Sequence, residues 1–196
     1  MKILGIHASP RKGGNTDILL SALLESAAGA GADTDEIFTR DLTVTGCVAC
    51  GGCDDTGACV LKDDMARVYP LLSRAGAVVL SAPVYFYNVP ARAKALIDRS
   101  QALWAARALE KRAGRDPGYH GRGYLIAVGA TRGENLFVGM ELTAKYFFDA
   151  LGLSYEGGLF FRRVEEKGAI REVEGAIGRA RELGRKIALQ DLPKSE

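Results

Sequence analysis

Short segments rich in apolar residues alternate along the chain with longer segments in which apolar residues recur every three or four positions. One short segment, AVVLS at residues 77–81, is uninterrupted, as expected for a central parallel strand that is covered on both faces. Strands are predicted at residues 2–8, 33–39, 77–81, 124–128 and 153–161.

Helices are predicted between these strands. The clearest one, at residues 137–151, has apolar residues at three-and-four spacing and is closed by Gly152. The other predicted helices cover residues 15–29, 63–74, 90–109 and 167–189. This alternation predicts a three-layer α/β fold, with a doubly wound five-stranded parallel sheet and right-handed crossovers. No internal repeat interrupts residues 1–196, which indicates one domain with a cysteine-rich loop at residues 46–60.

The charge balance narrows the range of partners. The 196 residues include 26 Lys and Arg against 24 Asp and Glu, a net charge of +2. This net positive charge is too small to indicate binding to nucleic acid or to an anionic membrane. No apolar stretch approaches the length of a membrane span, and the segment MKILGIHASPRKGG lacks the pattern of a secretory signal. We therefore expect a cytoplasmic protein with neither nucleic acid nor membrane as a partner.

The first predicted strand ends in a loop that has the residues of a phosphate site. In SPRKGGNT, at residues 9–16, Gly13 and Gly14 let the backbone approach a ligand closely. The loop leads into a helix N-terminus, whose free N–H groups and dipole favour an anion. The pattern is neither GxxxxGK(S/T) nor GxGxxG, which favours a mononucleotide over ATP or a dinucleotide; the alternative is an ordinary Gly-rich turn. The candidate ligands are Ser9, Arg11, Lys12, Gly14, Asn15 and Thr16.

Two further loops follow the third and fourth predicted strands and would lie at the same edge of the sheet. The first, PVYFYN, offers three aromatic rings and an amide, which suit stacking and edge hydrogen bonds with a flat heteroaromatic ring. The same aromatic residues could instead belong to the core or to an interface. Because ligands of such sheets bind at this edge, the candidate site extends to both loops. Its further members are Pro83, Val84, Tyr85, Phe86, Tyr87, Asn88, Thr131 and Arg132.

The four cysteines of the chain are clustered with the spacing CxxCxxCxxxxxC. In a reducing compartment, clustered thiols indicate metal or redox chemistry more than structural disulfides. Gaps of two residues let three thiolates surround one face of a [4Fe-4S] cluster, and the fourth closes the site. A four-cysteine zinc site usually splits into two CxxC pairs, so the triple disfavours zinc; zinc and redox-active disulfides stay open as alternatives. The predicted metal ligands are Cys47, Cys50, Cys53 and Cys59.

The segments SPRKGGNT, APVYFYNVP and KALIDR resemble those of the flavodoxin-like NADPH-dependent FMN reductases, and the resemblance spans the whole chain in the same order. It implies a flavodoxin-like fold with residues 83–88 and 129–135 around the isoalloxazine ring. It also implies that the phosphate and ribityl end of FMN is held by Ser9, Arg11, Lys12, Asn15 and Thr16. The cysteine spacing is similar to that of the iron-sulfur flavoproteins, whose compact motif binds a [4Fe-4S] cluster. The arginine-rich segment 107–122 matches no motif of these families.

We therefore expect an FMN-dependent oxidoreductase that transfers electrons between a [4Fe-4S] cluster and FMN. The resemblance implies a ferredoxin-like electron donor and a homodimer or homotetramer, and the small-molecule acceptor could be a quinone, oxygen or peroxide. No catalytic side chain is expected beyond the two cofactors, because His7 and His120 lie near no nucleophile. Two alternatives stay open: an NAD(P)H-dependent FMN or quinone reductase without a cluster, and a cysteine-based redox sensor or metal-binding module.

Overall fold

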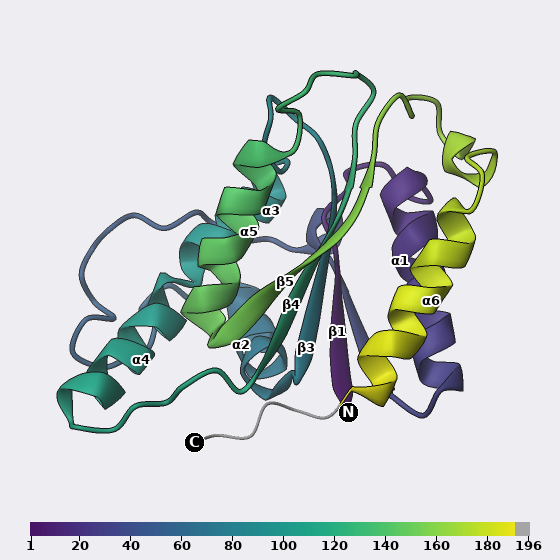
Figure 1. Cartoon of the computed structure of the whole chain (residues 1–196). Coiled ribbons are helices and arrows are strands. Elements are labelled where there is room, and N and C mark those ends of the chain that lie inside the picture. The colour runs from purple at the N-terminus through teal and green to yellow at the C-terminus, as the bar shows by residue number, and fades with distance from the viewer. Residues whose placement is uncertain (191–196) are drawn as a thin grey trace.

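The computed structural model describes residues 1–190 and contains a five-stranded sheet (Figure 1). Neighbouring strands are all parallel, in the order β2-β1-β3-β4-β5, which confirms the predicted doubly wound α/β fold. The strands are β1 (Lys2–His7), β2 (Asp33–Phe38), β3 (Ala77–Pro83), β4 (Gly121–Val128) and β5 (Leu153–Phe161).

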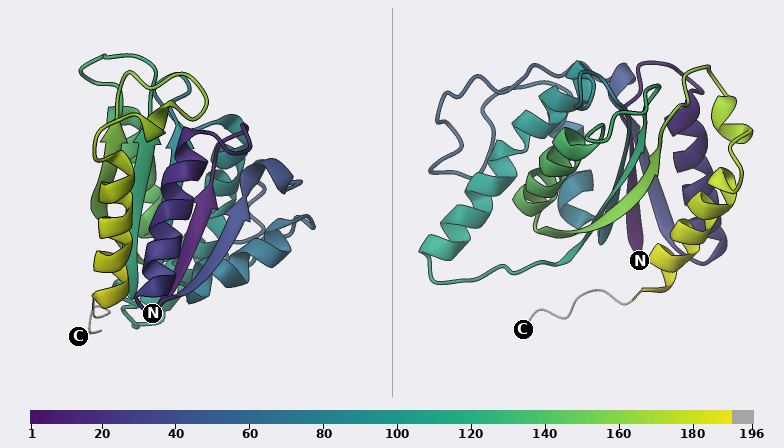
Figure 2. Two further views of the ribbon diagram at one scale, coloured as in Figure 1. Left: turned by 90° about the vertical axis from the view of Figure 1, so that its right-hand side faces the viewer. Right: turned by 45° about the horizontal axis from the view of Figure 1, so that its top comes forward.

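Helices cover both faces of the sheet and give the molecule three layers (Figures 1 and 2). One face carries α1 (Asn15–Gly29) and α6 (Ala176–Leu189), which pack side by side. The other face carries α2 (Met65–Arg74), α3 (Ala91–Arg99) and α5 (Val138–Leu151), and α4 (Gln101–Arg112) packs against α5. Each face buries its own cluster of apolar side chains. Strand β3 contributes to both clusters, as its uninterrupted apolar sequence predicts.

The close approach of α5 to the sheet depends on Gly123 in β4. A Cβ atom at this position would lie 2.2 Å from Cγ of Phe148, a fully buried side chain of α5. The ring of Phe148 in turn stacks on Tyr155 of β5, with 6.0 Å between ring centroids. The space that a side chain at residue 123 would occupy is therefore filled by the ring of Phe148.

The single helix predicted at residues 90–109 is wrong, because two helices occupy this segment and meet at Ser100. The Ser100 hydroxyl donates a hydrogen bond of 3.3 Å to the carbonyl of Leu96, one turn earlier, and such bonds often bend helices. Arg99, immediately before the break, is held by groups outside the helix. Helix α4 then continues to Arg112, beyond the end of the helix predicted at residues 90–109.

The helix predicted at residues 167–189 begins only at Ala176. The preceding residues form the 3-10 turn η2 (Ala169–Arg171), which lies between two glycines in the left-handed region. Gly168 has φ of 88° and Gly175 has φ of 69°, a conformation that ends regular helix. A second 3-10 turn, η1 (Thr39–Asp41), includes the last residue of the strand predicted at 33–39.

The other boundaries differ from the prediction by one to three residues. Strand β3 continues to Pro83, and β4 begins at Gly121 rather than at residue 124. Helix α2 begins at Met65 and α5 at Val138, each one or two residues late. Helix ends are the least certain part of any pattern-based assignment, since the periodicity extends into the capping residues.

The carboxyl ends of the strands share one edge of the sheet, at the top of Figure 1. The strand order reverses between β1 and β3, because the chain proceeds from β1 to β2 on one side and from β3 to β4 and β5 on the other. Ligands of open α/β sheets bind in the crevice at such a reversal. Within residues 1–190, no helix has the length and apolarity needed to cross a membrane.

Candidate functional site

The loop between β1 and α1 is a tight turn that is held by its own backbone. Gly13 has φ of +65°, and the N–H of Gly14 donates to the carbonyl of Arg11 at 3.0 Å. The hydroxyl of Ser9 accepts a hydrogen bond of 3.1 Å from the N–H of Arg11. The turn delivers the chain directly into the first turn of α1, where backbone N–H groups have no partner within the helix. This local geometry suits an anion.

Thr16, in the first turn of α1, has a buried polar atom without a partner. The side chain is 2% exposed, and its Oγ1 makes no hydrogen bond to the described protein. A buried polar atom left unpaired costs about 1–3 kcal/mol. A phosphate oxygen would satisfy the hydroxyl, and the residues of this loop therefore fit a phosphate group.

A cavity of about 200 Å³ joins this loop to three others at the carboxyl edge of the sheet. The structure thus brings together most of the predicted residues of the first loop and half of those of the β3 loop. The β4 loop contributes Ala130, and the loop after β5 contributes Val164 and Glu165, which the sequence analysis missed. The predicted residues in the wall are Ser9, Arg11, Gly14, Asn15, Thr16, Pro83, Val84 and Tyr85. Those outside it are Lys12, Phe86, Tyr87, Asn88, Thr131 and Arg132.

The side chain of Asn15 forms hydrogen bonds across this cavity to the loop that follows β5. Its Nδ2 donates to the carbonyl of Glu166 at 2.9 Å, and its Oδ1 accepts from the N–H groups of Gly168 at 2.9 Å and Ile170 at 3.2 Å. A guanidinium nitrogen of Arg11 also reaches the carbonyl of Glu165, at 3.4 Å. The amide of Asn15 is therefore engaged by the backbone of a distant loop.

The aromatic loop after β3 is a two-residue turn. Tyr85 and Asn88 exchange backbone hydrogen bonds of 2.8 and 2.9 Å. The residues between them, Phe86 and Tyr87, have φ of 49° and 61°, a region that disfavours residues with a side chain. Phe86 is fully solvent-exposed and Tyr87 is 54% exposed. Strained backbone that presents exposed rings beside a cavity is typical of a ligand-binding segment.

Gly139, in the first turn of α5, lets this helix approach the aromatic loop closely. A Cβ atom at Gly139 would lie 2.5 Å from the carbonyl oxygen of Tyr87. The hydroxyl of Tyr87 also lies close to Gly133 of the β4 loop, where a Cβ atom would be 3.2 Å away. The aromatic loop and the loop at residues 129–135 are therefore packed together, even though Thr131 and Arg132 lie outside the cavity wall.

An ion-pair network lies beneath the phosphate loop and was not foreseen from the sequence. The buried ring of His7 lies between two carboxylates, with Nδ1 at 3.0 Å from Asp17 and Nε2 at 2.7 Å from Glu36. Asp17 also accepts the N–H of Gly13 at 2.9 Å and pairs with Arg40 at 3.0 Å. Burial alone would raise the pKa of Asp17, but its hydrogen bonds with His7 and Gly13 outweigh burial and lower the pKa. The network fixes the loop to the core.

The cysteine segment extends from the sheet between η1 and α2 (Figure 1). None of its four cysteines forms a disulfide, and all four line one cavity of about 460 Å³. The structure thus places Cys47, Cys50, Cys53 and Cys59 around one cavity. Across residues 1–190, no group of three or more Cys, His, Asp or Glu side chains is already arranged to hold a metal ion.

Two of these thiols have shifted acidities. Burial raises the pKa of Cys53, and the charge of Asp54 adds to this effect. At Cys59 burial alone would also raise the pKa, but interactions with the backbone of Leu61 and with the nearby side chains of Tyr69 and Arg99 lower it. Four free thiols around one cavity match the donor set of a [4Fe-4S] cluster, which is held by four cysteine thiolates.

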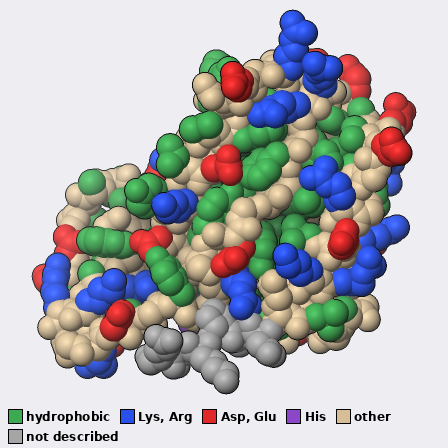
Figure 3. Space-filling view, viewed as in Figure 1, with side chains coloured by type: hydrophobic (Ala, Val, Ile, Leu, Met, Phe, Trp, Pro, Cys, Tyr) green, Lys and Arg blue, Asp and Glu red, His purple; other side chains and the backbone are tan. Residues whose placement is uncertain are grey.

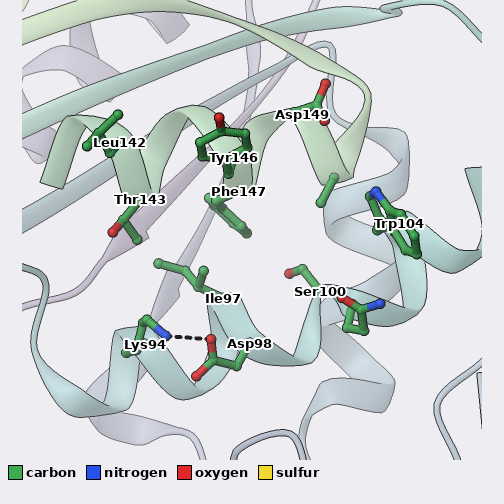
Figure 4. Close-up of a pocket in the computed structure, with 12 residues that line it drawn as sticks. Lys94, Ile97, Asp98, Ser100, Trp104, Leu142, Thr143, Tyr146, Phe147 and Asp149 are labelled. Carbon is green, nitrogen blue, oxygen red and sulfur yellow. Dashed lines mark hydrogen bonds and ion pairs between the residues drawn. The ribbon is translucent and has the colours of Figure 1, made fainter. Parts of the chain in front are cut away.

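A third hollow lies between α3 and α4 on one side and α5 on the other (Figure 4). It has a volume of about 540 Å³, and Lys94 and Asp98 form an ion pair of 2.6 Å at one end. Trp104 and Tyr146 line it and are largely exposed, 48% and 68%. Figure 3 shows green apolar side chains interspersed with charged ones on the side of the molecule that is seen in Figure 1. Asp98 also lines the cysteine cavity, so the two hollows adjoin.

Comparison with known proteins gives a consistent picture. The profile of the NADPH-dependent FMN reductase family matches residues 1–148. An iron-sulfur flavoprotein of Methanosarcina thermophila is 46% identical over 103 residues, 53% of this chain and 54% of that protein. The iron-sulfur flavoprotein MJ0731 of Methanocaldococcus jannaschii is 30% identical over 162 residues, 82% of this chain and 77% of that protein. The chain spans about half the length of several curated relatives that it matches.

Solved structures support the fold. The crystal structure of Smu.1420 from Streptococcus mutans UA159 matches with a TM-score of 0.71 at 16% identity, over 95% of this chain and 100% of that one. A likeness at this identity shows a shared architecture.

Proposed function

Because the chain belongs to the NADPH-dependent FMN reductase family and, within it, to the iron-sulfur flavoproteins, we propose that it binds FMN and one [4Fe-4S] cluster and passes electrons between them. One observation carries this proposal. The same chain has a phosphate-type cavity with an unpartnered Thr16 hydroxyl and a separate cavity lined by four free cysteines.

The phosphate loop would hold the phosphate of FMN. Its donors are the N–H groups at the start of α1, the Thr16 hydroxyl and the guanidinium of Arg11. The loop offers one anion site and no second fingerprint, which favours FMN over FAD. The neighbouring loops, residues 83–88 and 129–135, would surround the flavin ring, with the exposed rings of Phe86 and Tyr87 available for stacking.

The four cysteines would bind the cluster as thiolates. A cluster exchanges single electrons, whereas a flavin exchanges one or two, so the pair converts single-electron delivery into two-electron chemistry. The contribution of the chain is to position the two groups. The phosphate loop and the cysteine segment follow the carboxyl ends of β1 and β2, and a neighbouring subunit would bring one cluster close to the other chain's FMN.

The proposed partners follow from this electron flow. A ferredoxin-like protein would supply electrons to the cluster, and a small molecule such as a quinone, oxygen or peroxide would accept them from the flavin. We place these reactions in the cytoplasm and expect a homodimer or homotetramer. The iron-sulfur flavoproteins among the relatives support the pairing of the two cofactors.

A second candidate function is an NAD(P)H-dependent FMN or quinone reductase in which the cysteines hold no cluster. The match of residues 1–148 to the NADPH-dependent FMN reductase family supports it. A third, a cysteine-based sensor, would require a chain that binds no flavin.

Anaerobic purification with quantification of iron, sulfide and released flavin separates these candidates. We expect about four irons and four sulfides per chain, the content of one cubane cluster, together with FMN. Zinc without sulfide would contradict the cluster, and FAD would contradict the single phosphate site. In rapid mixing, reduced ferredoxin should reduce the flavin, whereas NADH or NADPH should do so slowly. If NADH or NADPH reduces the flavin as quickly in a cysteine variant as in the parent protein, the second candidate function is correct.

A further inference from the structure

Arg99, the last residue of α3 and of the KALIDR segment, is a buried cation at the base of the cysteine loop. Its side chain is 1% exposed. One terminal nitrogen donates to the carbonyl of Thr45 at 2.8 Å and to Oδ2 of Asp63 at 2.6 Å. The other donates to Oδ1 of Asp63 at 3.2 Å and to the carbonyl of Leu61 at 3.4 Å. These partners lie before and after residues 46–60, so one guanidinium joins both ends of the loop.

The carboxylate of Asp63 completes this junction. Its Oδ2 accepts the N–H of Thr45 at 3.1 Å, and its Oδ1 accepts the N–H of Met65 at 3.0 Å. A buried charge is tolerated when it is paired and its hydrogen bonds are satisfied, and this pair nearly meets both conditions. Replacement of a buried ion pair by packed apolar residues is often neutral for stability, so stability alone does not account for a buried charge at this place.

One nitrogen atom of the Arg99 guanidinium takes no part in these hydrogen bonds. Nε of Arg99 is buried and has no hydrogen-bond partner in the part of the chain that the structure describes. Arg99 lines the cavity that is also lined by the four cysteines, and it is the one cation among the residues of that wall. The acidic residues of the wall are Asp54 and Asp98, whereas Asp63 lies outside it. A sulfur atom in the cavity would give Nε–H an acceptor.

We propose that Arg99 is a positioning residue for the cluster: it joins the two ends of the cysteine loop, and its free Nε–H donates a hydrogen bond to a sulfur of the cluster. This inference rests on the proposed function. A hydrogen bond and a positive charge beside the sulfurs stabilise the more negative, reduced state. Arg99 therefore raises the reduction potential of the cluster.

The first test uses the unmodified sequence. Protein is produced with arginine that carries ¹⁵N at Nε, loaded with the cluster anaerobically, reduced and studied by pulsed EPR spectroscopy. We expect a ¹⁵N coupling to the cluster that is absent from Arg99→Lys protein labelled in the same way. Full cluster occupancy without any ¹⁵N coupling would overturn the inference.

The second test measures the midpoint potential of the cluster in variants. The potential should fall in Arg99→Gln and fall less in Arg99→Lys, which keeps the charge. The matched control is Arg67→Gln, which removes an exposed arginine that pairs with Asp64 at 3.2 Å, and it should leave the potential unchanged. Loss of the cluster from Arg99→Gln with retained FMN and thermal stability also supports the inference. An unchanged potential in a fully loaded Arg99→Gln protein would contradict it.

The proposed function and the role of Arg99 can be refuted separately. If the parent protein binds no iron and sulfide, the proposed function fails. If the parent protein binds the cluster but shows neither the coupling nor the shift, only the role of Arg99 fails. If the Arg99 variants do not fold, the labelled parent protein decides the question alone.

Discussion

The buried hydroxyl of Ser81 donates a hydrogen bond of 2.9 Å to the backbone carbonyl of Thr16. This bond joins the carboxyl end of β3 to the first turn of α1, across the point where the strand order reverses. The backbone of Thr16 is thereby fixed, while its own hydroxyl has no partner. A residue held in place by its main chain with an unused buried side-chain donor is prepared for a ligand.

Replacing Thr16 with Ala should weaken FMN binding without destabilising the protein that lacks FMN. The hydroxyl makes no hydrogen bond in the described chain, so its removal costs the fold little. Loss of its contact to phosphate should cost about 1–3 kcal/mol of binding. Flavin titration and thermal melting measure the two effects, and Thr16→Ser, which keeps the hydroxyl, should bind nearly as the parent does. Equal affinity in the Ala variant would place the phosphate elsewhere.

Replacing Phe86 with Gly or with Ala should separate backbone strain from aromatic stacking. Both variants lose the ring, but only Gly tolerates φ of 49° without a steric cost. We expect the Gly variant to be about 1 kcal/mol more stable to urea than the Ala variant. Both should bind FMN more weakly than the parent by about 0.5–1.5 kcal/mol, the usual value of an aromatic pair. Parent-like affinity in both would remove Phe86 from the flavin site.

Stability should fall on acidification partly because of Asp17. The folded state lowers the pKa of Asp17 below its usual 3.8, so the stabilisation is fully present above that value and is lost as pH falls through the folded pKa. Asp17→Asn should be less stable at neutral pH by about 1–3 kcal/mol and should show a shallower loss of stability below pH 4. The control is Glu25→Gln, an exposed position of α1. Denaturant melts at a series of pH values test this, and parallel pH profiles of Asp17→Asn and the parent would contradict it.

Loss of the cluster should leave FMN binding intact. The cysteine cavity and the phosphate cavity have no lining residue in common. We expect Cys59→Ser to lose iron, sulfide and ferredoxin-driven flavin reduction while it keeps parent-like affinity for FMN. Chelation of iron from the parent protein should have the same result. Joint loss of both cofactors would show that the two sites depend on each other.

The sequence predicts the fold well where the signal is local. Buried parallel strands such as AVVLS are continuous apolar runs, and each is bounded by residues that favour loops. The break at Ser100 carries no such signal, because the apolar periodicity of residues 90–109 continues through it. The contacts that hold Arg99 beside the break come from Thr45 and Asp63, which are remote in the sequence.

The candidate site likewise contains residues that a local sequence pattern predicts and residues that it does not. Ser9, Gly14 and Thr16 belong to one short turn, so their composition alone indicates a phosphate site. The side chain of Asn15 instead contacts backbone more than 150 residues away, which no local pattern reveals. His7 is a lone histidine in an apolar strand, and its role becomes visible only when folding brings Asp17 and Glu36 to its ring.

The cysteine segment lies entirely within the crossover from the edge strand β2 to β3. Thr43 and Asp64 already meet at its base, where the N–H of Thr43 donates to the Asp64 carboxylate at 2.6 Å. The entropy cost of closing a loop grows only with the logarithm of its length. We therefore expect that this segment can be shortened or exchanged without changing the strand register, so that gain or loss of the proposed metal site in evolution need not disturb the rest of the fold.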